Sequence, residues 1–220
     1  MKGGGPISTP IILLLAAGQA RRWKTAGGES IASHKLLAPL KEARVIDMAL
    51  ARAFASGLDI HACISTHAPS EIKEVLEILA TKVHLMPEHY GMGDVIAAAV
   101  KATAKANGWL ILPADMPLLS PETIRSVATA LKTHAVVVPQ YQGQGGHPVG
   151  FSKDCRTALT ALSGDSGAKT IVQAHAAAQT LHYLKLDDAG ILMDIDTPED
   201  LHRASTFISN HSSGSPRTSI

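Results

Sequence analysis

The stretch Ile11–Lys35 reads IILLLAAGQARRWKTAGGESIASHK, and it decides the fold. Its first five residues are aliphatic without alternation, which is typical of a strand buried on both faces of a parallel sheet. Small residues follow, and then a polar loop that contains Arg21 and Arg22 and leads to Lys35. Ligands of open α/β sheets bind outside the carboxyl ends of the strands. Backbone amides, two guanidinium groups and an ammonium group gathered there form a receptor for a polyanion such as a triphosphate.

This loop matches neither of the two commonest phosphate-binding motifs. A Walker A loop requires G-x-x-x-x-G-K-[ST], and a dinucleotide fingerprint requires G-x-G-x-x-G. After Gly18 the next glycines are Gly27 and Gly28, so neither spacing fits. Taken alone, the segment leaves open a second interpretation, a strand followed by an ordinary basic surface loop.

Composition excludes several classes of protein. The chain has 220 residues, 45% of them hydrophobic and 18% charged, with a net charge of +1. These values are normal for one globular α/β domain, and so small a net charge argues against a dedicated binder of nucleic acid or of membrane surfaces. No apolar run reaches the roughly 18 residues of a membrane span, and no secretory signal is expected. Cys63 and Cys155 are too few for a disulfide framework, so we expect buried thiols and a cytoplasmic protein.

Apolar strand-like runs alternate with helix-like segments through most of the chain. Proline opens three of the helical segments at or near the first turn, where its missing N–H is not needed. The alternation predicts an α/β fold of three layers, a mainly parallel, twisted sheet with helices on both faces. We expect a flexible N-terminus over residues 1–10, one folded domain over 11–209 and a disordered tail over 210–220. The expected strands are 11–16, 60–66, 82–86, 109–113, 135–139, 149–151 and 181–185, and the expected helices are 45–56, 69–80, 94–106, 121–132, 166–177 and 198–208.

An aspartate follows the expected strand at residues 109–113. The segment WLILPADMPLL (109–119) ends its apolar run in Asp115, and prolines then turn the chain away. At the carboxyl end of a central strand this carboxylate points into the same crevice as the first loop. Mg²⁺ usually binds one or two carboxylates plus substrate phosphates, so Asp115 is a candidate ligand. The alternative is a turn aspartate that caps the helix near Pro121, although Ser120 is the better cap candidate.

A second acidic segment, DIDTPEDL (194–201), lies near the C-terminus. We expect Asp194 and Asp196 to face opposite sides, so that only one of them can join Asp115 at a metal. Asp196 is our choice, with Asp194 as the fallback. Thr197 is a candidate N-cap residue, which assigns Glu199 and Asp200 to the positive end of a helix, a structural role.

Two glycine-bearing loops complete the candidate site. The segment GQGGHPVGF (143–151) surrounds His147 with glycines and suggests a crossover or a lobe over the sheet in which backbone amides approach a substrate. The segment SGDSGAK (163–169) carries Asp165 and Lys169 at a helix entry. Each loop taken alone is more often an ordinary turn.

Together these segments resemble the molybdenum cofactor cytidylyltransferase family, within the larger group of MobA-like nucleotidyltransferases. The matching pieces occur in the family's order and span about residues 13–204. The GHPV and GD-x-GA elements are the more specific to the branch that handles molybdopterin. The resemblance implies a Rossmann-like nucleotidyltransferase fold for the single domain 11–209. The matching pieces are LAAGQARR (15–22), KLLAPL (35–40), PADMPLL (113–119), GGHPVGF (145–151), GDSGAK (164–169) and DIDTPEDL (194–201).

The resemblance also implies an activity. The family moves CMP from CTP onto a terminal phosphate of molybdopterin or molybdenum cofactor, releases pyrophosphate and uses Mg²⁺. The LAAG form of the first loop, as opposed to LAGG, goes with cytidine nucleotides, and a molybdenum hydroxylase would be a transient partner. By position in the family's motifs, Lys35, Arg22 and Asp115 would be catalytic, and Asp115 and Asp196 would bind the metal. The nucleotide-binding residues would be Leu15, Ala16, Ala17, Gly18, Arg22, Lys35, Pro113 and Ala114, and the acceptor-binding residues Gly146, His147 and Asp165.

The sequence departs from the family pattern at Trp23-Lys24, in the long spacer that follows as far as His34, and at Asp94, where the family usually has a hydroxyl. Asp94 could repel phosphate or could help to hold a second cation. Two alternatives stay open: a non-catalytic chaperone that binds and delivers molybdenum cofactor, supported by the long loop and Asp94, and a same-fold relative with another nucleotide or small molecule. A metal hydrolase built on the eleven histidines is excluded, because their spacing supplies no paired ligand set.

Overall fold

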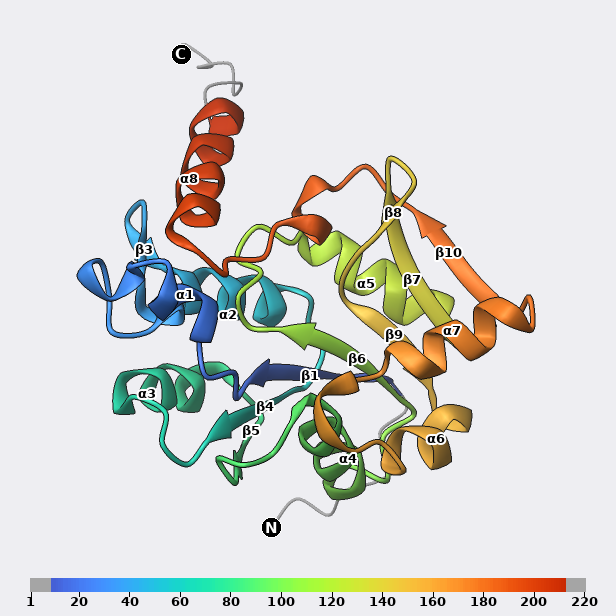
Figure 1. Ribbon diagram of the computed structural model, residues 1–220. Coiled ribbons are helices and arrows are strands. Elements are labelled where there is room, and N and C mark those ends of the chain that lie inside the picture. The colour runs from blue at the N-terminus through green and yellow to red at the C-terminus, as the bar shows by residue number, and fades with distance from the viewer. Residues whose placement is uncertain (1–8, 213–220) are drawn as a thin grey trace.

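The structure, a computed structural model, describes residues 9–212 and has an 8-stranded sheet at its centre (Figure 1). The strand order is β10-β7-β9-β6-β1-β4-β5, with β8 attached to β7. The strands are β1 (Ile11–Ala16), β4 (Ile60–Ser65), β5 (Lys82–Met86), β6 (Gly108–Pro113), β7 (Val136–Tyr141), β8 (Gln144–Gly145), β9 (Val149–Ser152) and β10 (Leu181–Lys185). A separate two-stranded sheet pairs β2 (Pro39–Leu40) with β3 (Ala43–Arg44).

The helices alternate with these strands along the chain. They are α1 (Arg21–Thr25), α2 (Val45–Ala55), α3 (Ser70–Leu79), α4 (Met92–Ala102), α5 (Pro121–Ala130), α6 (Arg156–Thr160), α7 (Lys169–Ala177) and α8 (Pro198–Ser212). The predicted elements are all present. The largest differences in their bounds are that α4 ends at residue 102 and not 106, that α7 begins at 169 and not 166, and that α8 runs on to Ser212. Residues 210–212 are therefore helical and not part of a tail, while 1–8 and 213–220 lie outside the described residues.

The sheet is mainly parallel, as predicted. Strand β1 runs parallel to both β4 and β6, and further parallel pairs join β4 to β5 and β7 to β10. Strand β9 is antiparallel to both of its neighbours, β6 and β7. The glycine-rich segment before β9 forms no lobe over the sheet: β8 folds back on β7 as a hairpin, and the chain then enters the sheet between β7 and β6.

Two apolar cores, one on each face of the sheet, produce the predicted three layers. Alternate residues of β1 point to opposite faces. Ile12 and Leu14 pack into the core that α2, α3 and α5 cover, whereas Ile11 and Leu13 pack into the core that α4 and α6 cover. All four side chains are fully buried, which explains why this strand is apolar without alternation. Figure 1 shows α4 and α6 below the sheet and α5 above it.

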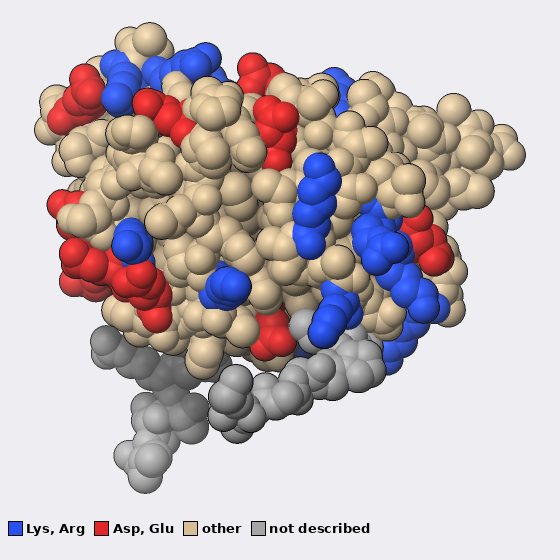
Figure 2. Space-filling model, turned by 90° about the horizontal axis from the view of Figure 1, so that it is seen from below, with Lys and Arg blue, Asp and Glu red and all other residues tan. Residues whose placement is uncertain are grey.

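One face of the molecule shows how its charged side chains are distributed. Seen from below, the described part of the molecule carries basic and acidic side chains interspersed with uncharged ones, without a continuous basic field (Figure 2). Within residues 9–212, no helix combines the length and the apolar character that crossing a bilayer requires. Cys63 and Cys155 are free and buried, as predicted.

Candidate active site

A cleft of about 770 Å³ opens at the carboxyl ends of the central parallel strands. Strands β1 and β6 end there, and β9, which runs in the opposite direction, begins there. Segments from across the sequence therefore line one cavity. They are residues 15–22, 34–36, 88–92, 115–116, 145–147 and 191–192, together with Val95, Pro113, Asp165, Asp194 and Asp196.

The first loop forms one wall of this cleft. Leu15 and Ala16 still belong to β1 and are buried, and Ala17 and Gly18 follow at increasing exposure. Ala20 has a left-handed backbone (φ 52°), which turns the loop into α1. The loop is anchored to β6 because the Ala114 N–H donates a hydrogen bond to the Leu15 carbonyl (3.0 Å).

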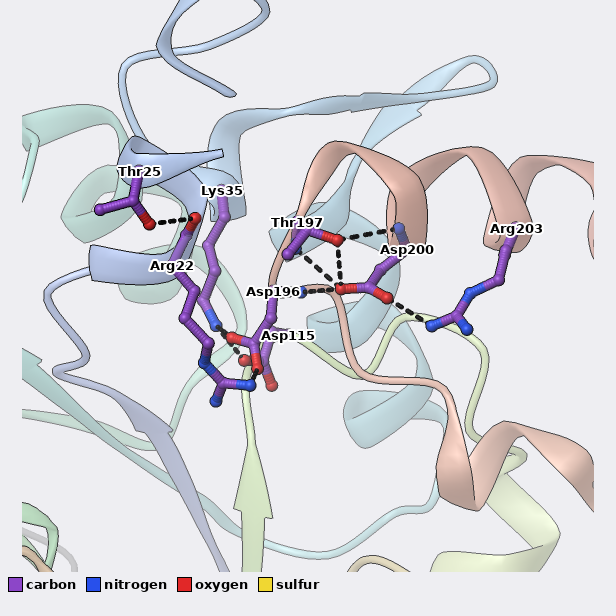
Figure 3. A network of polar contacts seen from close by, with 8 residues as sticks. All are labelled: Arg22, Thr25, Lys35, Asp115, Asp196, Thr197, Asp200 and Arg203. Atoms are coloured by element: carbon purple, nitrogen blue, oxygen red, sulfur yellow. Dashed lines mark hydrogen bonds and ion pairs between the residues drawn. The ribbon is translucent and has the colours of Figure 1, made fainter. Parts of the chain in front are cut away.

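A cluster of charged side chains from distant parts of the sequence meets in the cleft (Figure 3). The Lys35 ammonium group contacts Asp115 Oδ2 and lies 2.6 Å from Asp196 Oδ1. Arg22 reaches the other oxygen of Asp196, also at 2.6 Å. Burial alone would lower the pKa of Lys35, but the carboxylates of Asp115 and Asp196 outweigh it and raise the pKa. Lys35 therefore stays protonated beside two carboxylates whose side chains are largely buried.

Two carboxylates of this cluster are suited to a divalent cation. Asp115 Oδ1 is buried and accepts no hydrogen bond from the described residues, so one ligand oxygen is free inside the cleft. Asp196 is 8% exposed and has both oxygens engaged by cations. No group of three or more His, Cys, Asp or Glu side chains within residues 9–212 forms a ready-made metal site. Two carboxylates do fit Mg²⁺ or a similar ion that takes its remaining ligands from phosphates.

The placement of Asp194 corrects one expectation. Asp194 and Asp196 both line the cleft, because side chains two residues apart in an extended segment point to the same side. Ile195 between them is buried in the core instead. Partial burial and the nearby charges of Asp115 and Asp196 raise the pKa of Asp194. Of these two carboxylates, Asp196 is the one that forms ion pairs with Lys35 and Arg22 within residues 9–212.

The start of α8 fixes Asp196. Asp200 Oδ2 accepts hydrogen bonds from the backbone N–H groups of Asp196 (3.0 Å) and Thr197 (2.8 Å). Burial disfavours the ionised form of Asp200. The two backbone hydrogen bonds and a third from the Thr197 hydroxyl outweigh this effect and lower the pKa of Asp200. Thr197 Oγ1 in turn accepts from the Asp200 N–H (3.3 Å), a reciprocal cap (Figure 3). The structural role predicted for Asp200 is confirmed.

His34 is a component of the site that the sequence analysis missed. It is 8% exposed, and its Nδ1 accepts a hydrogen bond from the Leu36 N–H (3.2 Å). The proton of the neutral ring is therefore on Nε2, which lies 3.2 Å from the Gly18 carbonyl and donates to it. Burial lowers the pKa of His34, which favours this neutral form. The imidazole thus ties the first loop to the turn that carries Lys35.

The residues expected to bind the acceptor lie in the same cleft. Only glycine fits at Gly146, because an added Cβ would lie 2.2 Å from the Ile191 carbonyl oxygen. The His147 N–H donates to that same carbonyl (3.1 Å). His147 Nδ1 is buried without a hydrogen-bond partner among the described residues, and burial lowers the pKa of the ring. Asp165 lines the cleft from a more exposed position.

The expected nucleotide-binding residues separate into two groups. Leu15, Ala16, Ala17, Gly18, Arg22, Lys35 and Pro113 line the cleft. Ala114 is 1% exposed and does not line it, because its side chain packs into the core below the loop and its N–H holds the Leu15 carbonyl. The cleft also includes residues 88–92, which no candidate site residue of the sequence analysis covered. In this segment the Glu88 carbonyl accepts a hydrogen bond from the Gln19 side chain (3.3 Å) across the mouth of the cleft.

The long first loop and Asp94 have structural roles. Trp23 is fully buried, and its indole N–H donates to the Ala32 carbonyl (3.0 Å), while Gly28 packs directly on the ring. The carboxylate of Asp94 accepts the N–H groups of Gly91 (3.0 Å) and Gly164 (3.1 Å). Asp94 is not among the residues that line the cleft, which argues against a direct role in repelling phosphate or holding a second cation. Asp94 Oδ2 is already used by the two backbone N–H groups.

Comparison with known proteins places these features in a family. The model of the MobA-like NTP transferase domain matches residues 12–180. The purine catabolism protein PucB of Bacillus subtilis (strain 168) is 28% identical over 205 residues, which cover 86% of this chain and 92% of PucB. The molybdenum cofactor cytidylyltransferase of Escherichia coli (strain K12) is 25% identical over 183 residues, 80% of this chain and 90% of that protein.

A solved structure agrees with the fold. Rv0371c of Mycobacterium tuberculosis H37Rv, crystallised in complex with manganese, superposes with a TM-score of 0.74 at 22% sequence identity. The superposition covers 90% of this chain and 99% of Rv0371c.

Proposed function

The chain belongs to the family of MobA-like NTP transferase domains, and from that membership we propose that it moves CMP from CTP to the terminal phosphate of a molybdopterin-type acceptor. The similarity to the cytidylyltransferase of Escherichia coli supports this choice of nucleotide and acceptor. The observation that carries the proposal is the cluster of largely buried Lys35, Asp115 and Asp196 with the exposed Arg22 at the carboxyl end of the sheet. It combines two cations for phosphates with two carboxylates for a metal.

In the proposed reaction an oxygen of the acceptor phosphate attacks the α-phosphorus of CTP. A new phosphorus–oxygen bond forms, the bond from the α-phosphorus to the bridging oxygen breaks, and pyrophosphate leaves with that oxygen. The protein contributes position and charge, since such a step requires little covalent chemistry from it. Arg22 binds the β- and γ-phosphates from its exposed position at the cleft rim. Lys35 leaves the carboxylates and neutralises the charge that grows on the α-phosphate.

Asp115 and Asp196 are the proposed ligands of Mg²⁺, and the buried, unpartnered Asp115 Oδ1 supports that role. The metal would supply a positive charge shared between the carboxylates and the phosphates. The manganese complex of Rv0371c supports the use of a divalent cation in a protein of the same fold. His147 and Asp165 would face the acceptor, and the unpartnered Nδ1 of His147 offers a hydrogen-bond acceptor to it.

The proposed setting follows from the same chemistry. We place the protein in the cytoplasm, where the free thiols of Cys63 and Cys155 stay reduced, with a molybdenum hydroxylase as the proposed recipient of the product. The two features that favoured a non-catalytic chaperone, the long first loop and Asp94, have structural explanations. The long first loop packs on Trp23 and Asp94 binds backbone amides, so neither feature requires a carrier function.

The test is release of pyrophosphate with Mg²⁺ and purified molybdopterin, measured in parallel with CTP, GTP and ATP. Release with CTP alone would establish the activity and the choice of base. Release with GTP or ATP would support nucleotidyl transfer but would change the proposed nucleotide substrate. If none of the three nucleotides supports release while molybdopterin binds measurably, the proposed function is wrong and the carrier alternative returns.

A further inference from the structure

Asp94 joins two segments that lie 70 residues apart in the sequence. Its Oδ2 accepts one hydrogen bond from the Gly91 N–H at the start of α4 (3.0 Å) and one from the Gly164 N–H (3.1 Å). Gly91 belongs to the 88–92 wall of the cleft, and Gly164 precedes Asp165, which lines the cleft from the other segment. One carboxylate oxygen therefore holds two parts of the cleft wall together.

The two segments are in close backbone contact at this point. A Cβ added to Gly91 would lie 2.4 Å from the carbonyl carbon of Gly164, and one added to Gly93 would lie 2.8 Å from the Ser163 carbonyl oxygen. The Asp165 carboxylate also lies against Gly91, with Oδ1 2.6 Å from the same added Cβ. The position of Asp165 in the cleft therefore depends on how the 163–165 turn is seated on the start of α4.

We propose that Asp94 is a positioning residue for the acceptor end of the cleft, holding the turn that carries Asp165 on the N-terminus of α4. Asp94 does not itself line the cleft, so it acts through Gly91 and Gly164. Its loss would displace Asp165, whereas within residues 9–212 neither Lys35 nor Arg22 forms an ion pair with Asp94. The effect should therefore fall on the acceptor and leave nucleotide binding unchanged. The expected effect on turnover with the acceptor rests on the proposed function.

The simpler explanation is that Asp94 only caps α4. The chain offers a matched control, because Asp47 occupies the same third position of α2 and accepts the N–H of Arg44 (3.0 Å). Within residues 9–212 the other hydrogen bonds of Asp47 come from the Arg44 side chain, so Asp47 holds no distant loop. Replacing either aspartate by alanine removes a helix cap, but only Asp94→Ala releases a second segment of the cleft.

The experiment compares Asp94→Ala, Asp94→Asn and Asp47→Ala in the full chain. Loss of a cap should lower Tm by about 2–6 °C in both alanine variants. In Asp94→Ala, hydrogen exchange of the 160–168 peptide should accelerate at least about tenfold, and kcat/KM for molybdopterin should fall about tenfold or more, since small displacements of positioning groups have such effects. The Kd for CTP should change less than about twofold. Asp94→Asn should restore wild-type exchange, because its carbonyl oxygen can accept both N–H groups.

The following results would overturn parts of the proposal. Unchanged exchange of the 160–168 peptide in Asp94→Ala, or equal acceleration in Asp47→Ala, would overturn the coupling and leave a plain helix cap. An equal loss for CTP and for molybdopterin would overturn the assignment to the acceptor end. If the wild-type protein releases no pyrophosphate, the proposed function fails, and the exchange measurement still tests the coupling on its own.

Discussion

Replacing Lys35 by methionine removes the cation between Asp115 and Asp196 and keeps a side chain of similar length. The side chains of Lys35, Asp115 and Asp196 are only 10%, 15% and 12% exposed, so water screens their charges poorly. Removing one partner of such a buried pair typically costs about 3–5 kcal/mol, since the remaining charge stays buried without compensation. Arg22 remains beside Asp196, but its side chain is 76% exposed and compensates little. We therefore expect the free energy of unfolding to fall by about 3–5 kcal/mol at pH 7.

The pH dependence follows from the direction of the shift. The pKa of Lys35 lies above its ordinary value of 10.5, so in the wild type the stabilisation is fully present below pH 10.5 and is lost only as the pH rises through the higher folded value. In Lys35→Met two carboxylates repel each other without the ammonium group between them. The variant lacks the titrating ammonium group, so its deficit relative to the wild type should shrink as the pH rises from 7 to about 11.

Urea unfolding followed by circular dichroism at pH 7 and about pH 11 measures both effects. The control is Lys73→Met, because Lys73 pairs with Glu77 at 3.8 Å on the surface, where the two side chains are 48% and 55% exposed. Such a pair contributes about 0.3–0.5 kcal/mol, so the control should stay close to the wild type at both pH values. A deficit of Lys35→Met no larger than that of the control, or one of equal size at both pH values, would refute the reasoning.

Three further predictions concern turnover, the acceptor and the first loop. Asp115→Asn should lower turnover by about 10²-fold or more, the scale of losing one strong electrostatic contact; an unchanged rate of pyrophosphate release would remove Asp115 from the reaction. His147→Ala should raise KM for the acceptor and leave the Kd for CTP unchanged in calorimetry, whereas a weaker Kd for CTP would place His147 at the nucleotide. Gly28→Ala would bring a Cβ within 2.4 Å of the Trp23 ring and should reduce stability by about 1–3 kcal/mol in thermal unfolding. Gly18→Ala, with nothing within 4 Å of its added Cβ, is the stability control, and equal values for the two would contradict the packing argument.

The parts of the fold that follow one residue pattern over several positions could be predicted from the sequence. The run Ile11–Ala16 is buried along its whole length, and a strand covered on both faces leaves that signal in any sequence. Charged residues that follow such strands, Asp115 among them, reach the cleft for the same reason, because parallel strands end at one edge.

Contacts between single residues far apart in the chain could not be predicted in this way. His34 binds the Gly18 carbonyl, and Asp94 binds the Gly164 N–H. A lone histidine before an apolar segment, or a lone acid in a first helical turn, has the same local pattern whether or not its second partner exists. At both positions the sequence differs from the family motif, but the sequence alone does not say why. The structure shows which distant backbone group each of these two side chains binds.

The direction of β9 explains why the residues proposed to bind the acceptor lie in the same cleft as those proposed to act on the phosphates. Apolar patterning identifies a strand but carries no information on its direction, and β9 is antiparallel to β6. A strand that runs against its neighbours begins at the edge where they end, so Gly146 and His147, which precede β9, come to lie beside Asp115, which follows β6. Had β9 been parallel, the same loop would open on the opposite edge of the sheet. The antiparallel direction of β9 therefore brings Gly146 and His147 to the edge of the sheet where Asp115 lies, and no additional domain is needed to complete the cleft.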